Sequence, residues 1–197
     1  MAMLEYNEVR ERKIIMYDGA PYEVISSHVF RKQQRKPVNA TKIKNLLTGR
    51  VAEISFGSSE KVEEADISNK MVKYLYTAKG EVWCSEIKDP SKRFAIKAEI
   101  AGDKMRFIKA NSEIELIVFT DEDDEEIAIG VKTPIKVELK VTDAPPSIKG
   151  NTATGGNKVA TLETGATINV PLFIDIGETI RVNTETGEYS ERVGSSF

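Results

Sequence analysis

The chain has 197 residues, of which 40% are hydrophobic, and its 28 basic and 31 acidic residues give a net charge of −3 at pH 7. This is the composition of a globular protein, and no run approaches the ~20 apolar residues of a membrane-spanning helix. The first residues, Met-Ala-Met-Leu-Glu, lack the apolar segment of a secretory signal. A single cysteine, Cys84, excludes an internal disulfide framework and a cysteine-based zinc site. We therefore expect a cytoplasmic protein that uses no metal and no cofactor.

Residues suited to catalysis are scarce. A Cys-His dyad would need Cys84 and the single histidine, His28. Cys84 follows Trp83 in an apolar stretch, where a thiol is usually buried, and His28 lies in a predicted strand. A Ser-His-Asp triad would need the same His28, and no G-x-S-x-G motif accompanies it. The sequence therefore does not favour an enzyme.

The N-terminal third alternates short apolar segments with turn signals. We predict strands over residues 12–17, 22–30, 38–47 and 51–56, separated by Asp18-Gly19, a basic segment and Thr48-Gly49. An Asp-Gly pair between apolar segments is typical of a tight hairpin. In the second strand, alternation places Tyr22, Val24 and Ser26 on one face. This spacing predicts a small barrel, whose closure pairs the edge strands.

Positive charge is concentrated in the same region. No Asp or Glu occurs between Val24 and Ala52, and the rest of the chain has 21 basic against 31 acidic residues. The seven cations of this window are Arg31, Lys32, Arg35, Lys36, Lys42, Lys44 and Arg50. We interpret segment 30–37 as the tip of a projecting hairpin that neutralises phosphates of nucleic acid. The alternative is a solvated hairpin with no partner.

The remaining two thirds predict further β structure. Residues 57–69 are polar and acidic, which indicates a linker, and residues 95–111 permit a short helix. Further strands are predicted over 72–77, 81–87, 114–119, 127–131, 135–141, 167–170, 173–174, 179–184 and 189–193, with a loop over 147–158. The six acidic residues 121–126 favour a solvated turn over a calcium loop, because the glycine of such a loop is missing. The chain is predicted to be all-β, with three consecutive small barrels.

Several segments, in their order and spacing, resemble the bacterial elongation factor P family. They are Tyr22-Glu-Val24 with the basic tip, Leu46-Leu-Thr-Gly49, Tyr74-Leu-Tyr76, Glu81-Val-Trp83, Val137-Glu-Leu-Lys-Val141, Lys158-Val-Ala-Thr-Leu-Glu-Thr-Gly165, Val170-Pro-Leu-Phe173 and Gly187-Glu-Tyr189. The resemblance implies an N-terminal SH3-like, KOW-type domain over 1–64, a middle OB domain over 65–129 and a C-terminal OB domain over 130–197. It also implies an L-shaped outline similar to tRNA.

The resemblance implies a function as well. Family members bind the 70S ribosome between the P and E sites and stimulate peptide-bond formation, above all at consecutive prolines. The hairpin tip contacts the P-site tRNA near the peptidyl-transferase centre. For this chain the tip comprises Arg31, Lys32, Gln33, Gln34, Arg35, Lys36 and Pro37. We expect a monomeric translation elongation factor that is not an enzyme.

Further contacts are expected with the RNA backbone and with the small subunit. Lys42, Lys44 and Arg50 are expected to contact the backbone of rRNA or tRNA. Gly150, Asn151 and Thr152 correspond to the family loop that lies near the small subunit and the E-site codon of the mRNA. Asn151 stands where the family usually has Asp, so hydrogen bonding is kept and the charge is lost.

The tip departs from the family pattern. Many members carry a modified lysine or arginine there, whereas counting without gaps from Ser27 to Leu46 places Gln34 at this position. We expect Gln34 to act unmodified, with its amide both donating and accepting hydrogen bonds. Arg35, Lys32 or Lys36 would supply the cation if the register were shifted by a residue.

The alternative function is a general OB-type RNA-binding protein that is not specific to the ribosome. Such proteins combine a basic groove with exposed aromatic side chains. Here the sequence pattern places Tyr74, Tyr76, Trp83, Phe94 and Phe107 in the core, which disfavours this alternative.

Overall fold

Strands dominate the computed structural model, which describes residues 2–31, 35–121, 123–146 and 156–194. Within these ranges the helical segments are α1 (Ala98–Ala101) and the 3-10 helix η1 (Asp103–Phe107), inside the predicted helical stretch. None of the described helices has the length and apolar character needed to cross a lipid bilayer. The all-β prediction is confirmed.

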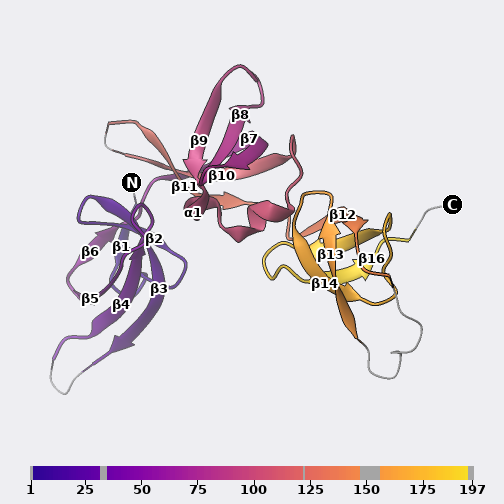
Figure 1. Ribbon diagram of the computed structural model, residues 1–197. Coiled ribbons are helices and arrows are strands. Elements are labelled where there is room, and N and C mark those ends of the chain that lie inside the picture. The colour runs from indigo at the N-terminus through magenta and orange to yellow at the C-terminus, as the bar shows by residue number, and fades with distance from the viewer. Residues whose placement is uncertain (1, 32–34, 122, 147–155, 195–197) are drawn as a thin grey trace. The chain divides into compact units, whose positions relative to one another are not determined.

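The N-terminal sheet is antiparallel in the order β2-β3-β4-β5 (Figure 1). Its strands are β2 (Ile14–Tyr17), β3 (Ala20–Phe30), β4 (Val38–Asn45) and β5 (Val51–Gly57). A second, two-stranded sheet pairs β1 (Met3–Glu5) with β6 (Lys61–Glu63), and an isolated bridge joins Ile15 to Glu64. The linker predicted over 57–69 is therefore wrong in part, because it contains β6 and the start of the next strand. β6 has three residues, of which Val62 is the buried one, and so short a segment cannot show an alternation in the sequence.

Two further sheets follow in the sequence. The first has the order β11-β10-β7-β8-β9 and the second β14-β13-β12-β15-β16. Their strands are β7 (Ile67–Ala78), β8 (Glu81–Glu86), β9 (Arg93–Lys97), β10 (Glu113–Thr120), β11 (Glu126–Lys132), β12 (Lys136–Asp143), β13 (Asn157–Leu162), β14 (Thr167–Pro171), β15 (Thr179–Asn183) and β16 (Tyr189–Arg192). β9 and β13 were not predicted, whereas the strand predicted at 173–174 is a turn.

Hairpin turns follow the local sequence. Asp18 and Gly19 have φ of 50° and 71°, and Lys79 and Gly80 have φ of 52° and 79°. Positive φ at both central residues matches the right-handed twist of the flanking strands. The prediction of a tight turn at Asp18-Gly19 is confirmed.

β-bulges reverse the side-chain pattern in two long strands. The β3–β4 register shifts between Val24 and Ser26, and the β7–β8 register shifts between Tyr74 and Tyr76. Because a bulge inserts one residue, the side chains beyond it point to the other face. Ser26 is therefore exposed opposite Lys42, and the prediction that it shares a face with the buried Val24 is wrong.

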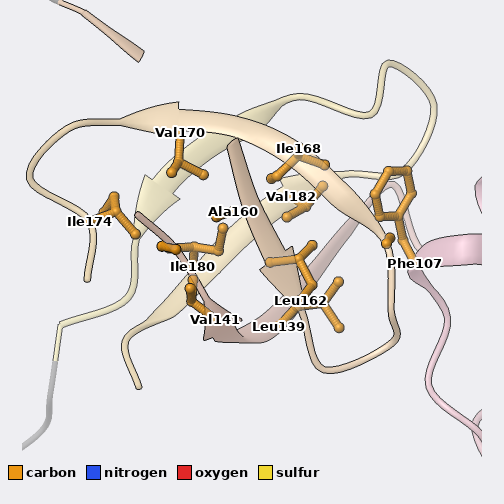
Figure 2. Packing of buried hydrophobic residues seen from close by; sticks show 12 residues of the cluster. Phe107, Leu139, Val141, Ala160, Leu162, Ile168, Val170, Ile174, Ile180 and Val182 are labelled. Carbon is orange, nitrogen blue, oxygen red and sulfur yellow. The ribbon is translucent and has the colours of Figure 1, made fainter. Parts of the chain in front are cut away.

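A residue from η1 completes the core of the C-terminal sheet. Phe107 is 1% exposed and belongs to the same apolar cluster as residues of β12 to β15. Figure 2 shows its ring at one end of this cluster, entering from a different segment of the chain. The other members are Leu139, Val141, Ala144, Ala160, Leu162, Ala166, Ile168, Val170, Ile174, Ile180 and Val182.

The chain packs as two compact units, Met1–Lys70 with Ile117–Gly130, and Met71–Leu116 with Val131–Phe197. In the first unit, Phe119 and Ile129 from β10 and β11 are buried together with Ala65. Partly buried Ile14 and Met16 of β2, and Leu46 in the turn after β4, pack against this cluster. The three-domain division at 64/65 and 129/130 remains a prediction.

Candidate nucleic-acid interface

The basic hairpin is built on three strands. β3 and β4 pair from Tyr22 opposite Asn45 out to Phe30 opposite Val38. β5 then pairs with β4 along the same length, as far as Gly57 opposite Val38. We call β3, β4, β5 and residues 31–37 the basic arm. A third strand satisfies the free edge of β4, so the arm is stiffer than a two-stranded hairpin.

Three cations of the tip fall within the described residues. Arg31, Arg35 and Lys36 are exposed, and Arg31 Nε donates a hydrogen bond to the carbonyl of Arg35 at 3.1 Å. Within the described ranges, none of these three side chains has a carboxylate oxygen within 4.0 Å. Pro37 is half-buried at the start of β4. Lys32, Gln33 and Gln34 lie outside the described residues.

The three cations expected to contact an RNA backbone lie farther from the tip. Lys42 and Lys44 alternate on the exposed face of β4, opposite the acidic residues Glu53 and Glu23 in the strand register. The ammonium of Lys42 lies 4.0 Å from the Glu53 carboxylate. Arg50 is exposed in the turn before β5. Positive charge is therefore partly balanced along the arm and unbalanced at the described tip residues.

A buried amide anchors the tip-proximal end of the arm, where Asn39 pairs with Val29 next to the outermost pair Phe30–Val38. Asn39 has no exposed surface, and its Nδ2 donates to the carbonyls of Tyr6 (2.6 Å) and Val9 (2.9 Å) between β1 and β2. These two carbonyls would otherwise lack a partner away from water, which is costly. Sequence reasoning missed this residue, although an Asn at an inward position of an alternating strand is an available signal.

A second buried amide shapes the turn that carries Arg50. The Oδ1 of Asn45 accepts hydrogen bonds from the backbone of Leu47 (2.9 Å) and Thr48 (2.8 Å). Gly49 follows with φ of 73°, a conformation that glycine adopts without strain. The predicted Thr48-Gly49 turn is confirmed.

The two residues considered for a catalytic dyad do not suit that role. Burial raises the pKa of the Cys84 thiol to about 11, so the nucleophilic thiolate is scarce at neutral pH. His28 is exposed on the basic arm, where its ring stacks on Phe30 with centroids 6.2 Å apart. These observations leave the pair without an activated nucleophile.

The acidic run closes a turn between β10 and β11. Asp121 Oδ1 accepts hydrogen bonds from the backbone of Asp123 (3.0 Å) and Glu125 (2.8 Å), and Glu126 pairs with Lys70 at 2.7 Å. Asp124 takes φ of 60° where a turn often uses glycine. The carboxylate of Asp121 is therefore engaged within the turn, and that of Glu126 in an ion pair with Lys70 of β7.

The loop expected at the small subunit lies outside the described residues, including Gly150, Asn151 and Thr152. Its flanks are described. Lys158, at the start of β13, has a side chain only 6% exposed and donates to the carbonyl of Pro145 (2.9 Å). Its Nζ also lies 3.4 Å from Asp175 Oδ1. A buried ammonium held by a carbonyl and a carboxylate fixes where the loop leaves and rejoins the sheet.

The predicted burial of the aromatic side chains is confirmed only in part. Tyr74 and Phe107 are buried. Trp83 and Phe94 are half-buried, and Tyr76 is 47% exposed. The prediction for Tyr76 is wrong, because the bulge at Leu75 turns it away from the face of Tyr74.

Comparison with protein families identifies both ends of the chain. The family described as "Elongation factor P (EF-P) KOW-like domain" matches residues 5–62, and "Elongation factor P, C-terminal" matches residues 137–192. A protein named "Elongation factor P" from Carboxydothermus hydrogenoformans is 37% identical over 191 residues, which cover 97% of this chain and 100% of the relative. Its namesake from Brachyspira hyodysenteriae is 41% identical over 191 residues, with 97% and 99% covered.

A solved structure supports the fold. "Eukaryotic translation initiation factor 5A from Methanococcus jannaschii" superposes with a TM-score of 0.53 at 14% identity, covering 66% of this chain and 94% of that one. At this identity the likeness concerns the fold alone. With the family matches and the sheets described above, it confirms the predicted KOW-type and OB-type β architecture.

Proposed function

Since the chain belongs to the elongation factor P family, and so is a translation elongation factor, we propose that it binds the ribosome between the P and E sites. There it speeds peptide-bond formation on stalled proline runs by positioning the P-site peptidyl-tRNA. Its partners are the 70S ribosome, its rRNA, the P-site tRNA and the E-site codon. It works as a monomer in the cytoplasm and needs no cofactor.

The observation that carries the proposal is the unbalanced charge at the end of the basic arm. Arg31, Arg35 and Lys36 are exposed, and no described carboxylate pairs with them. Such cations gain free energy by releasing counterions from phosphates. A guanidinium also forms two parallel hydrogen bonds to a phosphate or stacks on a base. This chemistry fits the acceptor end of a tRNA.

The factor contributes position rather than proton transfer. Holding two reactants in a productive geometry lowers the barrier through the entropy of orientation. The arm is suited to this, because three paired strands and the Asn39 clamp limit its motion. We therefore propose that the chain is not an enzyme and that the reaction is catalysed by the ribosome.

Separate residues take separate roles in this proposal. Gln34 contacts the acceptor end without modification, flanked by the cations of Lys32, Arg35 and Lys36. Lys42, Lys44 and Arg50 contact the RNA backbone. The loop with Gly150, Asn151 and Thr152 contacts the small subunit and the E-site codon, and the buried Lys158 supports the base of that loop.

The test is translation of a reporter that contains a proline run. The double variant Lys32→Ala/Arg35→Ala is expected to reduce the rate at the proline run roughly a hundredfold, because each substitution removes a charged hydrogen bond of about 1.5 kcal/mol. Lys61→Ala, an exposed lysine of β6, is the matched control and should leave the rate unchanged. Full activity of the double variant, with a folded chain, would refute a working tip.

The general RNA-binding alternative is favoured by the exposed ring of Tyr76, because such proteins use exposed aromatic side chains. Binding measurements separate it from the ribosomal proposal. The full chain is expected to bind 70S ribosomes with P-site tRNA far more tightly than free single-stranded RNA. Equal affinity for both would favour the alternative.

A further inference from the structure

The outer face of β7, β8 and β9 carries an aromatic and cationic surface. Val82 and Cys84 of β8 point into the core, so alternation places Glu81, Trp83 and Ser85 on the opposite face. On that face Glu81 is exposed and Trp83 is half-buried, whereas Ser85 is only 1% exposed. The strand registers align three cross-strand rows on this face. They are Tyr76–Trp83–Ala95, Lys73–Ser85–Arg93 and Ala78–Glu81–Lys97. We call these three rows the outer OB face.

An aromatic pair lies in the middle row. The rings of Tyr76 and Trp83 stack with centroids 6.1 Å apart and an interplanar angle of 21°. Tyr76 is 47% exposed, whereas Trp83 is half-buried beside it. Trp83 therefore supports the ring of Tyr76 from within the sheet, and a large part of the Tyr76 ring meets solvent. A supported, accessible ring is suited to stacking against a planar ligand.

Positive charge flanks this pair. Lys73 and Arg93 lie in one adjacent row and Lys97 in the other, against the single carboxylate of Glu81. Among the described residues, no carboxylate oxygen lies within ion-pair distance of Lys73, Arg93 or Lys97. The surface around this ring is therefore locally positive, although the chain as a whole has a net charge of −3.

We propose that the outer OB face binds an unpaired base of single-stranded RNA. The base stacks on Tyr76, and the cations of Lys73, Arg93 and Lys97 neutralise the adjoining phosphates. Stacking tolerates any base, and aromatic rings flanked by cations are how OB folds hold single strands. The second and third strands of such a fold are its usual ligand face. This site is separate from the basic arm and does not depend on the role proposed for the tip.

The single tryptophan of the chain makes the site directly observable. Titration of the full chain with a twelve-nucleotide oligouridylate at low salt is expected to quench the fluorescence of Trp83 in a saturable manner. Tyr76→Leu should weaken the affinity about tenfold, and Tyr76→Phe, which keeps the ring, should restore it. Arg93→Ala should weaken binding and lower the slope of log affinity against log salt by about one.

Controls separate this site from other effects. Tyr17→Leu removes another exposed tyrosine of an aromatic pair, on the N-terminal sheet, and should leave the titration unchanged. Arg35→Ala at the tip should also leave the Trp83 signal unchanged, which distinguishes failure of this proposal from failure of the arm. The inference is overturned if no quenching occurs, if Tyr76→Leu binds as tightly as the parent chain, or if a duplex RNA of equal length binds equally well.

Discussion

Single side chains at inward strand positions decide how the arm is held. Asn39 is fully buried and ties two carbonyls of the β1–β2 connection to β4. Asn45 caps the turn at the opposite end of the same strand. The partners of Asn39 lie 33 and 30 residues earlier in the chain, so its importance follows from the fold and not from the local pattern. The partners of Asn45 lie two and three residues later, so its role is a local feature of the turn.

The side chain of Gln34 leads to a prediction about covalent modification of the tip. The nitrogen of a side-chain amide shares its lone pair with the carbonyl, so it lacks the nucleophilic amine that a lysine offers for acylation. We expect the native protein to have the mass of its unmodified sequence, as measured by intact-mass spectrometry. A mass increment mapped by digestion to Lys32 or Lys36 would shift the working position to that neighbour.

Bulges explain which faces could not be read from the sequence. The inserted residues Ile25 and Leu75 reverse the alternation in β3 and β7, and carry Ser26 and Tyr76 to the outer face. The alternation is interrupted at both places, by Val24-Ile25 and by Tyr74-Leu75-Tyr76, but adjacent apolar residues do not by themselves specify a bulge. By contrast, most strand segments and the Asp18-Gly19 turn depend on local chemistry and were predictable, whereas β6, β9 and β13 were not. The role of the basic tip stays a prediction.

Longer elements were predicted where a strand has a clear alternation or is closed by glycine turns. β10 is an example: a strand is predicted over 114–119, and Ile114, Leu116 and Val118 are buried in alternation. The loop predicted over 147–158 from its Gly, Asn, Thr and Ser content includes the first two residues of β13, and the rest of β13 was assigned to no strand. Lys158 also occupies an inward position of β13, which hides the strand pattern. A charged residue is rarely buried unless it is paired, and its partners at Pro145 and Asp175 are distant in the sequence.

The connection after β13 leads to a prediction about pH. Glu163 bonds to the ammonium of Lys109 at 2.8 Å and to the backbone N–H of Lys140 at 2.8 Å. Burial acts to raise the pKa of Glu163, but these two hydrogen bonds and the charges of the two lysines outweigh it and lower the pKa below 4.5. The ionised carboxylate thus stabilises the fold above about pH 4.5, and this contribution is lost as the pH falls through the lowered value.

The expected result is that Glu163→Gln lowers the free energy of unfolding by about 1 kcal/mol at pH 7 and by less at pH 3. Urea denaturation at the two pH values measures the difference. Glu185→Gln, at an exposed position in the turn before β16, is the control and should change stability little at either pH. An equal loss at both pH values would contradict a role for the ionised carboxylate.

At the scale of the whole molecule, the distribution of charge matters more than its sum. A chain of net charge −3 is repelled overall by RNA, so binding depends on cations without nearby carboxylates. Arg31, Arg35 and Lys36 meet this condition among the described residues, whereas Lys42 has Glu53 at 4.0 Å. Contacts along the arm should therefore differ in their sensitivity to salt.

Ribosome binding between about 50 and 200 mM salt tests this difference. Arg35→Ala is expected to lower the slope of log affinity against log salt by about one, because one phosphate contact is lost. Lys42→Ala should lower it less, because its charge is already partly neutralised by Glu53. Identical slopes for the two variants would show that the local carboxylate has no influence.

Phe107 has a consequence for how the chain folds during synthesis. The C-terminal sheet cannot complete its core from its own strands, because one of the core side chains is delivered by η1, some thirty residues upstream of β12. On the ribosome, Phe107 emerges first and stays without its pocket until the last strands are made. A fragment that begins at β12 would fold around a void the size of an aromatic ring. The segment that folds with a complete core is therefore larger than the family match over residues 137–192. Grafting the C-terminal sheet onto another protein requires that η1 be included.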